Sequence, residues 1–201
     1  MQAWKLSSIT IAGASRLWCA CFFMVCIIDI NHYLRYSQTT ISVTMERRRL
    51  EINYTEYASK SEMPAADAAL LEKAEAMTAN SYAPYSNFHV GAAVLMSGGE
   101  VFCGSNQENA AFPSGLCAER TALYYAAAQH PDQDVVAVAI AAEYGGQKAK
   151  GIPSPCGNCR QSLVQYESKS GKPIKVILGG SDEILVFDSV ADLLPFVFDC
   201  I

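Results

Sequence analysis

The sequence predicts an α/β fold in which helices cover both faces of a mixed central sheet of about five strands, a three-layer α-β-α arrangement. Apolar segments of strand length alternate with alanine-rich segments that have helical spacing. The glycine-containing turn at 97–99 indicates an antiparallel hairpin, whereas later strands are separated by helices and need crossover connections. A sheet that contains both kinds of connection is mixed.

The first predicted helix spans 64–80 and is rich in alanine. Leu70, Leu71, Ala74 and Met77 recur at helical spacing, so this segment should pack one apolar face against the sheet. Proline is favoured at the start of a helix, and asparagine tolerates the left-handed conformation that often ends one. Both ends of the segment therefore match a helix.

The hairpin is predicted to contain strands at 88–96 and 100–104. A loop over 105–115 follows, and then an alanine-rich helix over 116–129 that ends before Pro131.

The second half of the chain is predicted to alternate between strands and helices. The apolar run at 134–142 is consistent with a buried strand. A helix at 157–166 follows, then strands at 173–178 and 183–187, and a final helical turn at 189–194.

The chain is 201 residues long with a formal net charge of −5, and this charge is distributed unevenly. Residues 1–44 carry Lys5, Arg16 and Arg35 against Asp29, which is a net charge of +2 and leaves −7 on the rest. An acidic body with no basic stripe disfavours binding to a nucleic-acid backbone. A small molecule is therefore favoured over a polynucleotide as substrate.

The first 44 residues contain an uninterrupted apolar run, Leu17–Ile28. Spanning a bilayer takes about 20 residues, and no small-residue cleavage site follows the run, so neither a membrane span nor a signal peptide fits well. We expect translation to start at Met45, with the preceding segment an upstream read-through; a targeting or anchoring segment is the alternative. The expected organisation is an extension at 1–44, a polar arm at 45–64 and one domain at 65–201, with a strand or an arm expected over 47–62.

Three cysteines and one glutamate form the strongest chemical pattern in the chain. Cys117 and Glu119 are two residues apart at the expected start of a helix, and Cys156 and Cys159 form a C-x-x-C pair directly after a proline. Three thiolates that leave one coordination position open suit a catalytic zinc ion, because a structural zinc site is usually closed by a fourth ligand. A ligand-x-Glu followed by P-C-x-x-C is also the pattern of zinc-dependent deaminases. A redox pair or a structural zinc site is the alternative, which Glu119 disfavours.

Four ordered motifs support a family resemblance that covers about residues 65–199. They are Y-S-N-F-H-V-G-A-A-V, N-Q-E-N-A, C-A-E-R-T-A and P-C-G-N-C-R-Q. With these motifs the chain resembles the small, homotetrameric cytidine deaminases whose zinc ligands are all cysteines. The resemblance implies one zinc ion per chain, a nucleoside as substrate and a homotetramer.

The resemblance also places four residues at the substrate. It implies that Phe88 packs against the base, that Asn106 and Glu108 bind the ribose hydroxyls, and that Ala118 contacts the substrate. An amide and a carboxylate on one loop are chemically suited to a vicinal diol. For Phe88, a place in the core of a strand is the alternative.

Three further roles follow from the resemblance. Arg120 matches the arginine that donates hydrogen bonds to the ligand sulfurs, and Arg160 is a weaker candidate for that role or a solvated helix charge. Phe112 stands where many relatives have tyrosine, so a hydroxyl contact between subunits is absent. Phe198 fits best the phenylalanine that one subunit lends to a neighbour's site.

Glu119 is the predicted proton shuttle. Zinc lowers the pKa of a bound water molecule toward neutrality, and Glu119 takes its proton. The water oxygen attacks C4 of the pyrimidine while Glu119 protonates N3. Glu119 then carries a second proton to the departing amino group, which leaves as ammonia.

These features predict an enzyme of pyrimidine salvage that deaminates cytidine and 2′-deoxycytidine. The alternatives are a deaminase of another aminopyrimidine nucleoside, such as blasticidin S, and a catalytically silent, zinc-stabilised assembly module. A polynucleotide deaminase is less favoured, since those enzymes usually have histidine as the first ligand. Reduced thiolates fit the cytoplasm, and no membrane contact is expected for 45–201.

Overall fold

The computed structural model describes residues 46–199, so the expected extension at 1–44 and the expected start at Met45 lie outside the described residues. The described residues from Leu50 onward cluster into one unit. Residues 46–54, within the expected polar arm, carry no helix or strand. In the described part of the chain, no helix is both long enough and apolar enough to cross a membrane.

Within residues 46–199 the central sheet has seven strands, so the predicted number of about five was wrong. The two additional strands, β1 and β5, are three and two residues long and too short to show an alternating pattern. The strand order is β1-β7-β6-β4-β2-β3, with β5 paired to β4. Strands β4 and β6 pair in parallel and the other pairs are antiparallel, which confirms the mixed sheet. The strands are β1 (Thr55–Tyr57), β2 (Phe88–Met96), β3 (Val101–Ser105), β4 (Val135–Tyr144), β5 (Gln147–Lys148), β6 (Lys175–Gly179) and β7 (Ile184–Phe187).

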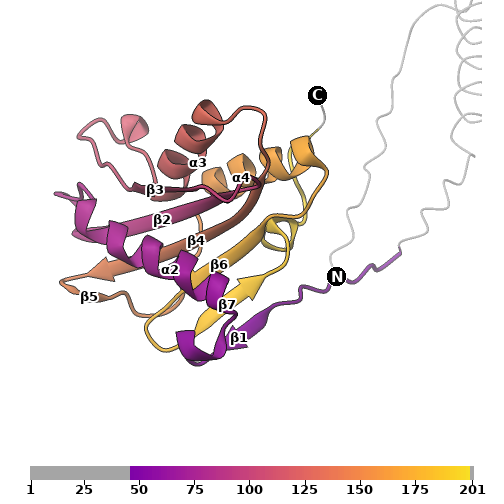
Figure 1. Ribbon diagram of the computed structural model, residues 1–201, viewed down its shortest axis with the longest axis horizontal. Coiled ribbons are helices and arrows are strands. Elements are labelled where there is room, and N and C mark those ends of the chain that lie inside the picture. The colour runs from indigo at the N-terminus through magenta and orange to yellow at the C-terminus, as the bar shows by residue number, and fades with distance from the viewer. Residues whose placement is uncertain (1–45, 200–201) are drawn as a thin grey trace, which may run out of the picture. The chain divides into compact units, whose positions relative to one another are not determined.

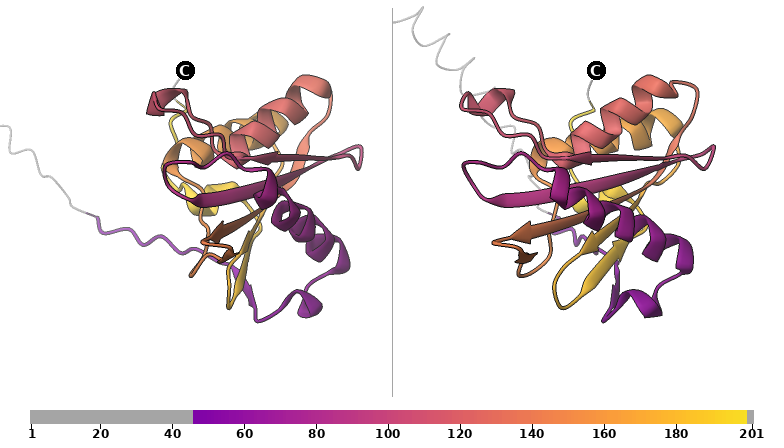
Figure 2. Two further views of the ribbon diagram at one scale, coloured as in Figure 1. Left: turned by 90° about the vertical axis from the view of Figure 1, so that its left-hand side faces the viewer. Right: turned by 60° about the vertical axis from the view of Figure 1, so that its left-hand side comes forward.

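Helices cover both faces of the sheet, as the three-layer α-β-α prediction requires (Figures 1 and 2). Helix α2 packs on one face, and α3 and α4 pack on the other. Alternation along β2 shows the division: Ala92 and Val94 belong to the core under α3 and α4, whereas Ala93 belongs to the core under α2. The helices are α2 (Ala65–Met77), α3 (Ala118–Gln129) and α4 (Gly157–Ser170), with short 3₁₀ helices η1 (Lys60–Glu62), η2 (Thr78–Asn80), η3 (Phe112–Ser114) and η4 (Val190–Leu193).

Two glycines let helices approach the sheet closely. A Cβ atom at Gly104 on β3 would lie 2.6 Å from the amide nitrogen of Ala122 and 2.9 Å from the carbonyl oxygen of Ala118, both on α3. A Cβ atom at Gly91 on β2 would overlap the carbonyl oxygen of Ala74 on α2. The absence of a side chain at Gly104 therefore brings the first turns of α3 against β3.

Glu75 on α2 ties two other segments to its face of the sheet. Its carboxylate accepts hydrogen bonds from Nζ of Lys60 and Nζ of Lys148, each at 2.6 Å. Burial raises the pKa of Glu75, but the hydrogen bonds from the two lysines outweigh this and lower the pKa below its ordinary value. The ionised carboxylate thus links η1 and β5 to α2.

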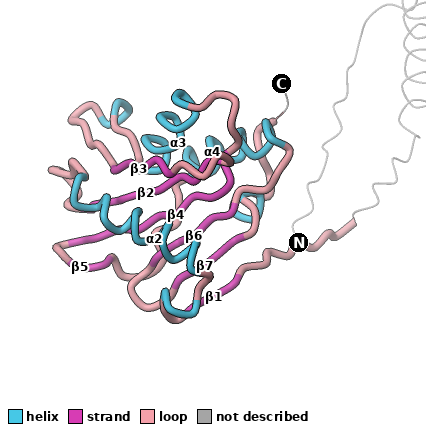
Figure 3. The backbone as a smooth tube through the Cα atoms, in the orientation of Figure 1, coloured by secondary structure: helices cyan, strands magenta, loops and turns pink. Residues whose placement is uncertain are grey.

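Two loops lie side by side where β2 begins and β3 ends (Figure 3). Residues 81–87 precede β2, and residues 106–117 follow β3. The amide of Tyr82 donates to the carbonyl of Asn106 at 3.0 Å, and the amide of Glu108 donates to the carbonyl of Tyr82 at 2.8 Å. The fold thereby joins two of the sequence motifs next to the start of α3.

Candidate active site

Helices α3 and α4 both begin at a cysteine. Cys117 is the N-cap residue of α3, Cys156 is the N-cap residue of α4, and Cys159 lies in the first turn of α4. The sulfur of Cys156 lies 3.8 Å from that of Cys117 and 3.5 Å from that of Cys159. The positive ends of two helix dipoles therefore face the sulfur atoms and favour their thiolate forms.

The three sulfur atoms fit a zinc ion. Tetrahedral zinc with Zn–S bonds of about 2.3 Å separates its sulfur ligands by about 3.8 Å. The three Sγ atoms all lie within 4.8 Å of one another, and within residues 46–199 no other group of three His, Cys, Asp or Glu side chains is gathered in this way. Three cysteines would leave one coordination position for water, which is the arrangement of a catalytic site.

Arg120 lies against the sulfur cluster. Its Nη2 donates a hydrogen bond to Sγ of Cys117 at 3.7 Å. Hydrogen bonds from the Cys159 thiol and from Arg120 lower the pKa of Cys117 to about 5, against the opposing effect of burial. The hydrogen bond to Cys117, burial and the charge of Glu119 raise the pKa of Cys159. The protein itself thus stabilises one thiolate, and Arg120 can offset the negative charge that three thiolates would bring.

The carboxylate of Glu119 is buried beside the sulfur atoms, and the residue is only 5% exposed. Burial raises the pKa of Glu119, and the negative charge of Cys117 raises it further. Hydrogen bonds from its own amide and from the Cys159 thiol act in the opposite direction without cancelling the rise. A carboxyl group whose pKa is shifted toward neutrality is suited both to accept and to return a proton.

A cavity of about 280 Å³ extends from the sulfur cluster along the loop at 106–117. Cys117, Arg120, Asn106 and Glu108 are among the residues that line it. The structure therefore brings together one metal-site cysteine, the arginine beside it and both residues that were predicted to bind a sugar.

The lining of this cavity does not include Phe88 or Ala118, the other two predicted substrate residues. Phe88 is partly exposed at the first position of β2, and Ala118 is buried as the first residue of α3. The side chain of Asn106 holds the backbone near Phe88: its Nδ2 donates to the Phe88 carbonyl at 2.9 Å, and its Oδ1 accepts from the amide of Val90 at 2.8 Å. Asn106 therefore also fixes the start of β2.

The two aromatic residues predicted at subunit contacts lie at the surface. Phe112 is 76% exposed, and its ring meets that of Tyr85 edge to face with centroids 6.1 Å apart. Phe198 is 68% exposed, but its backbone is fixed because the side chain of Gln161 donates to its carbonyl at 2.9 Å and accepts from its amide at 3.2 Å. Gln161 thus holds the chain end beside the first turns of α4.

The guanidinium of Arg160 is hydrogen-bonded to other parts of the protein, so Arg160 acts neither as a donor to the cysteine sulfurs nor as a solvated charge. Its guanidinium donates to the carbonyl oxygens of Pro155 and Leu193 and to Oγ of Ser154, each at 2.8 Å. It therefore anchors the segment before Cys156 to the last residue of η4. Its position directly after the C-x-x-C was the one signal for a role at the site.

Ser86 is another residue that sequence reasoning missed. Its hydroxyl contacts Glu108 and the backbone of Phe88. The available signal was a serine two residues before the start of a strand, where the hydroxyl can accept a hydrogen bond from the amide two positions later.

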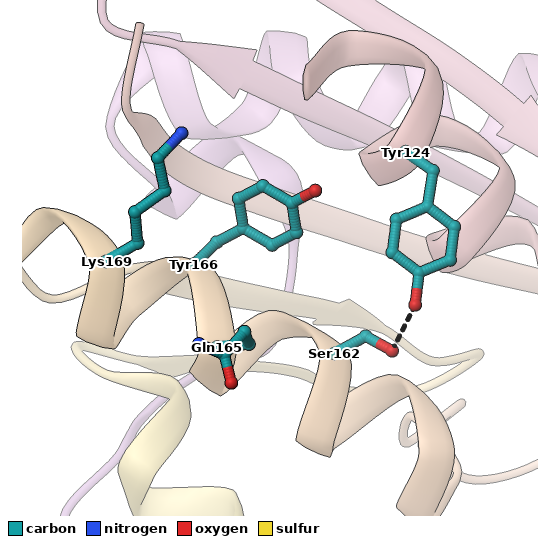
Figure 4. A pocket seen from close by; sticks show the side chains of 5 residues that line it. All are labelled: Tyr124, Ser162, Gln165, Tyr166 and Lys169. Carbon is teal, nitrogen blue, oxygen red and sulfur yellow. Dashed lines mark hydrogen bonds between the residues drawn. The ribbon is translucent and has the colours of Figure 1, made fainter. Parts of the chain in front are cut away.

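A second cavity, of about 370 Å³, lies between α3 and α4 and has a different character (Figure 4). The hydroxyl groups of Tyr124 on α3 and Ser162 on α4 are hydrogen-bonded at 2.8 Å within it. Neither a cysteine nor a carboxylate is among the residues that line this cavity. The lining residues are Tyr124, Ser162, Gln165, Tyr166 and Lys169.

A buried carboxylate beside three convergent thiols at helix starts is the arrangement found in the class of zinc-dependent hydrolases that deaminate nucleobases. Comparisons with known proteins agree with this class. A family model described as the cytidine and deoxycytidylate deaminase zinc-binding region matches residues 64–171. The chain belongs to the cytidine and deoxycytidylate deaminase family.

Individual relatives are similar over the same part of the chain. A cytidine deaminase of Halalkalibacterium halodurans is 39% identical over 129 residues, which are 64% of this chain and 91% of the relative. A probable cytidine deaminase of Dictyostelium discoideum is 32% identical over 59% of this chain and 74% of the relative. The crystal structure of cytidine deaminase from Burkholderia pseudomallei is 37% identical with a TM-score of 0.56, covering 68% of this chain and all of that one.

Proposed function

We propose that the protein hydrolyses cytidine and 2′-deoxycytidine to uridine and 2′-deoxyuridine with release of ammonia. The observation that carries this proposal is the buried carboxylate of Glu119 beside the clustered sulfur atoms of Cys117, Cys156 and Cys159. The cytidine deaminases among its relatives support the same reaction.

The three cysteines are the residues that would hold zinc. Zinc bound there would lower the pKa of a water molecule and so supply a nucleophile near neutral pH. Glu119 accepts a proton from that water, and the water oxygen adds to C4 of the base. Glu119 gives the proton to N3, so the ring nitrogen becomes neutral N–H as the C4–N3 double bond opens. It then moves the remaining hydroxyl proton to the amino group. The bond between C4 and the amino nitrogen breaks, ammonia departs, and C4 becomes a carbonyl carbon.

The raised pKa of Glu119 suits both transfers. A carboxylate that is too weak a base would not take the water proton, and one that is too strong would not return it. Burial, which causes this rise, also excludes bulk water that could otherwise accept the protons.

Asn106 and Glu108 are proposed to bind the sugar hydroxyls. One N–H of the Asn106 amide remains after its hydrogen bond to Phe88, so it can still donate to the substrate. Phe88 is proposed to pack against the base, and Ala118 to contact the substrate from the start of α3. The net charge of −7 outside residues 1–44 supports a free nucleoside over a nucleic acid.

We also propose a homotetramer and a cytoplasmic role in pyrimidine salvage. The exposed rings of Phe112 and Phe198 support contacts between subunits, because large apolar side chains at the surface are commonly covered in assemblies. Three cysteines that must stay reduced to hold a metal support a reducing compartment.

The test is the loss of cytidine absorbance in the ultraviolet, measured on the full chain and on Glu119→Gln, with zinc per chain determined on both. Wild-type turnover together with a zinc-containing but inactive variant would support the proposal. A wild-type chain that holds zinc but leaves cytidine and 2′-deoxycytidine intact would contradict it. Turnover of blasticidin S by such a chain would then indicate an altered substrate. No turnover of any of the three compounds would indicate a silent assembly module.

A further inference from the structure

Ser86 connects the two halves of the candidate substrate site. Its hydroxyl donates a hydrogen bond to Oε1 of Glu108, and Oγ of Ser86 accepts a hydrogen bond from the backbone amide of Phe88 at 3.0 Å. Glu108 is proposed to bind the sugar and Phe88 the base. One small side chain therefore touches the recognition elements for both parts of a nucleoside.

The loop that carries Ser86 holds both oxygens of the Glu108 carboxylate. Oε2 accepts from the amide of Tyr85 at 2.9 Å and from the amide of Ser86 at 3.2 Å. The hydrogen bonds from Ser86 and Tyr85 lower the pKa of Glu108, so the group is ionised at neutral pH. A carboxylate offers about four acceptor positions. With three of them occupied, the remaining direction is set by the protein and is free for a hydroxyl donor.

The shape of this loop is itself fixed by hydrogen bonds. The amide of Asn87 donates to the carbonyl of Ala83 at 3.0 Å, and Asn87 adopts a φ of 54°. Its Oδ1 lies 3.2 Å from Nε2 of His89, whose Nδ1 lies 2.8 Å from Oγ of Ser81. The loop therefore presents Ser86 to Glu108 without help from a substrate.

We propose that Ser86 is a positioning residue that sets the affinity for the sugar of the nucleoside by orienting the carboxylate of Glu108. This inference rests on the proposed function. A carboxylate that is already oriented needs no rearrangement when the substrate binds, so its effect falls on binding. The sugar takes no part in the bonds that form and break, and kcat is expected to change little.

The experiment is a double-mutant cycle in the full chain with cytidine as substrate. We expect Ser86→Ala to raise KM by about tenfold, because the carboxylate of Glu108 must then be ordered when the substrate binds, with kcat within about threefold of wild type. In a Glu108→Ala background, Ser86→Ala should raise KM by about threefold or less, because the carboxylate that it orients is gone. Equal effects in both backgrounds, or a fall in kcat with unchanged KM, would overturn the inference.

Two further variants separate orientation from general damage. Ser86→Thr keeps the hydroxyl and should stay within about threefold of the wild-type KM, whereas a loss as large as that of Ser86→Ala would count against the proposal. Ser97→Ala removes a turn hydroxyl that accepts from the amide of Asp134 and should leave KM unchanged. If Ser86→Ala does not fold by circular dichroism, Ser86→Cys takes its place, since its thiol is a weaker donor of similar shape. A wild-type chain without cytidine turnover refutes the proposed function directly, whereas an active wild type with independent mutational effects refutes the role of Ser86 alone.

Discussion

Replacing Gly104 by alanine tests whether close contact between β3 and α3 places the candidate active site. The new methyl group would lie 2.6 Å from the amide nitrogen of Ala122 and 2.9 Å from the carbonyl oxygen of Ala118. Both atoms belong to the backbone of α3, so no side-chain rotation relieves the overlap. The first turn of this helix carries Glu119 and begins at Cys117.

The size of the effect follows from these distances. Non-bonded heavy atoms rest at roughly 3.5 Å, so the helix or the strand must move by about 0.9 Å. Overpacking of this kind costs about 1–3 kcal/mol of unfolding free energy. For a chain of this size the melting temperature should fall by about 2–12 °C. Because a displacement of about 1 Å misplaces catalytic groups, kcat/KM should fall by about tenfold or more.

The assay is thermal unfolding by circular dichroism at one protein concentration, together with zinc per chain and kcat/KM for cytidine. Gly157→Ala is the matched control for stability, since a Cβ atom at this first position of α4 meets nothing within 4 Å. Alanine favours a helix over glycine, so the control should unfold at the wild-type temperature or slightly above it. If Gly104→Ala also melts within about 1 °C of wild type and keeps full activity, the close contact does not place the site.

Three other perturbations have defined outcomes. The pKa of Glu75 is lower in the folded state, so its carboxylate stabilises the protein above the unfolded pKa of 4.5 and this stability is lost as the pH falls through the folded pKa. In urea unfolding, the unfolding free energy of Glu75→Gln should be about 1 kcal/mol below that of wild type at pH 7 and equal to it in acid. A difference between the two proteins that does not change with pH would contradict this prediction. In Arg160→Lys the single ammonium group cannot reach the three separate acceptors of the guanidinium. The unfolding free energy should therefore fall by about 1–3 kcal/mol, and zinc should be lost more readily in competition with a chelator. Wild-type values in both measurements would count against the anchoring role. Removing zinc with a strong chelator should abolish deamination and make three more thiols per chain reactive, both reversed by added zinc; an unchanged thiol count would place the metal elsewhere.

The chemistry of the candidate site could be predicted because it is local in the sequence. Cys117 and Glu119 are two residues apart, and Cys156 and Cys159 are three apart at the start of a helix. Within one helical turn such spacings fix which side chains can meet, so the ligand pattern is visible before any fold is known. The alternation of strands and helices is also local, and it predicted the layers and the mixed sheet.

The bounds of the short strands β1 and β5 could not be predicted, since segments of three and two residues carry no period of their own. They form because a neighbouring strand offers an unpaired edge, which is a property of the assembled sheet. The roles of Arg160 and Ser86 were hidden for a related reason. Arg160 reaches Leu193, and Ser86 reaches Glu108, over separations that no local pattern encodes.

The sequence by itself determined the reactive groups, the order of the elements and the family motifs, because each depends on residues near one another along the chain. Only the tertiary structure decided how the two cysteine segments converge to 3.8 Å and how the loop at 81–87 orients Glu108. Both arrangements depend on the packing of helices and loops against the sheet. Backbone contacts such as that between Gly104 and α3 set these distances, and they exist only once the layers have come together.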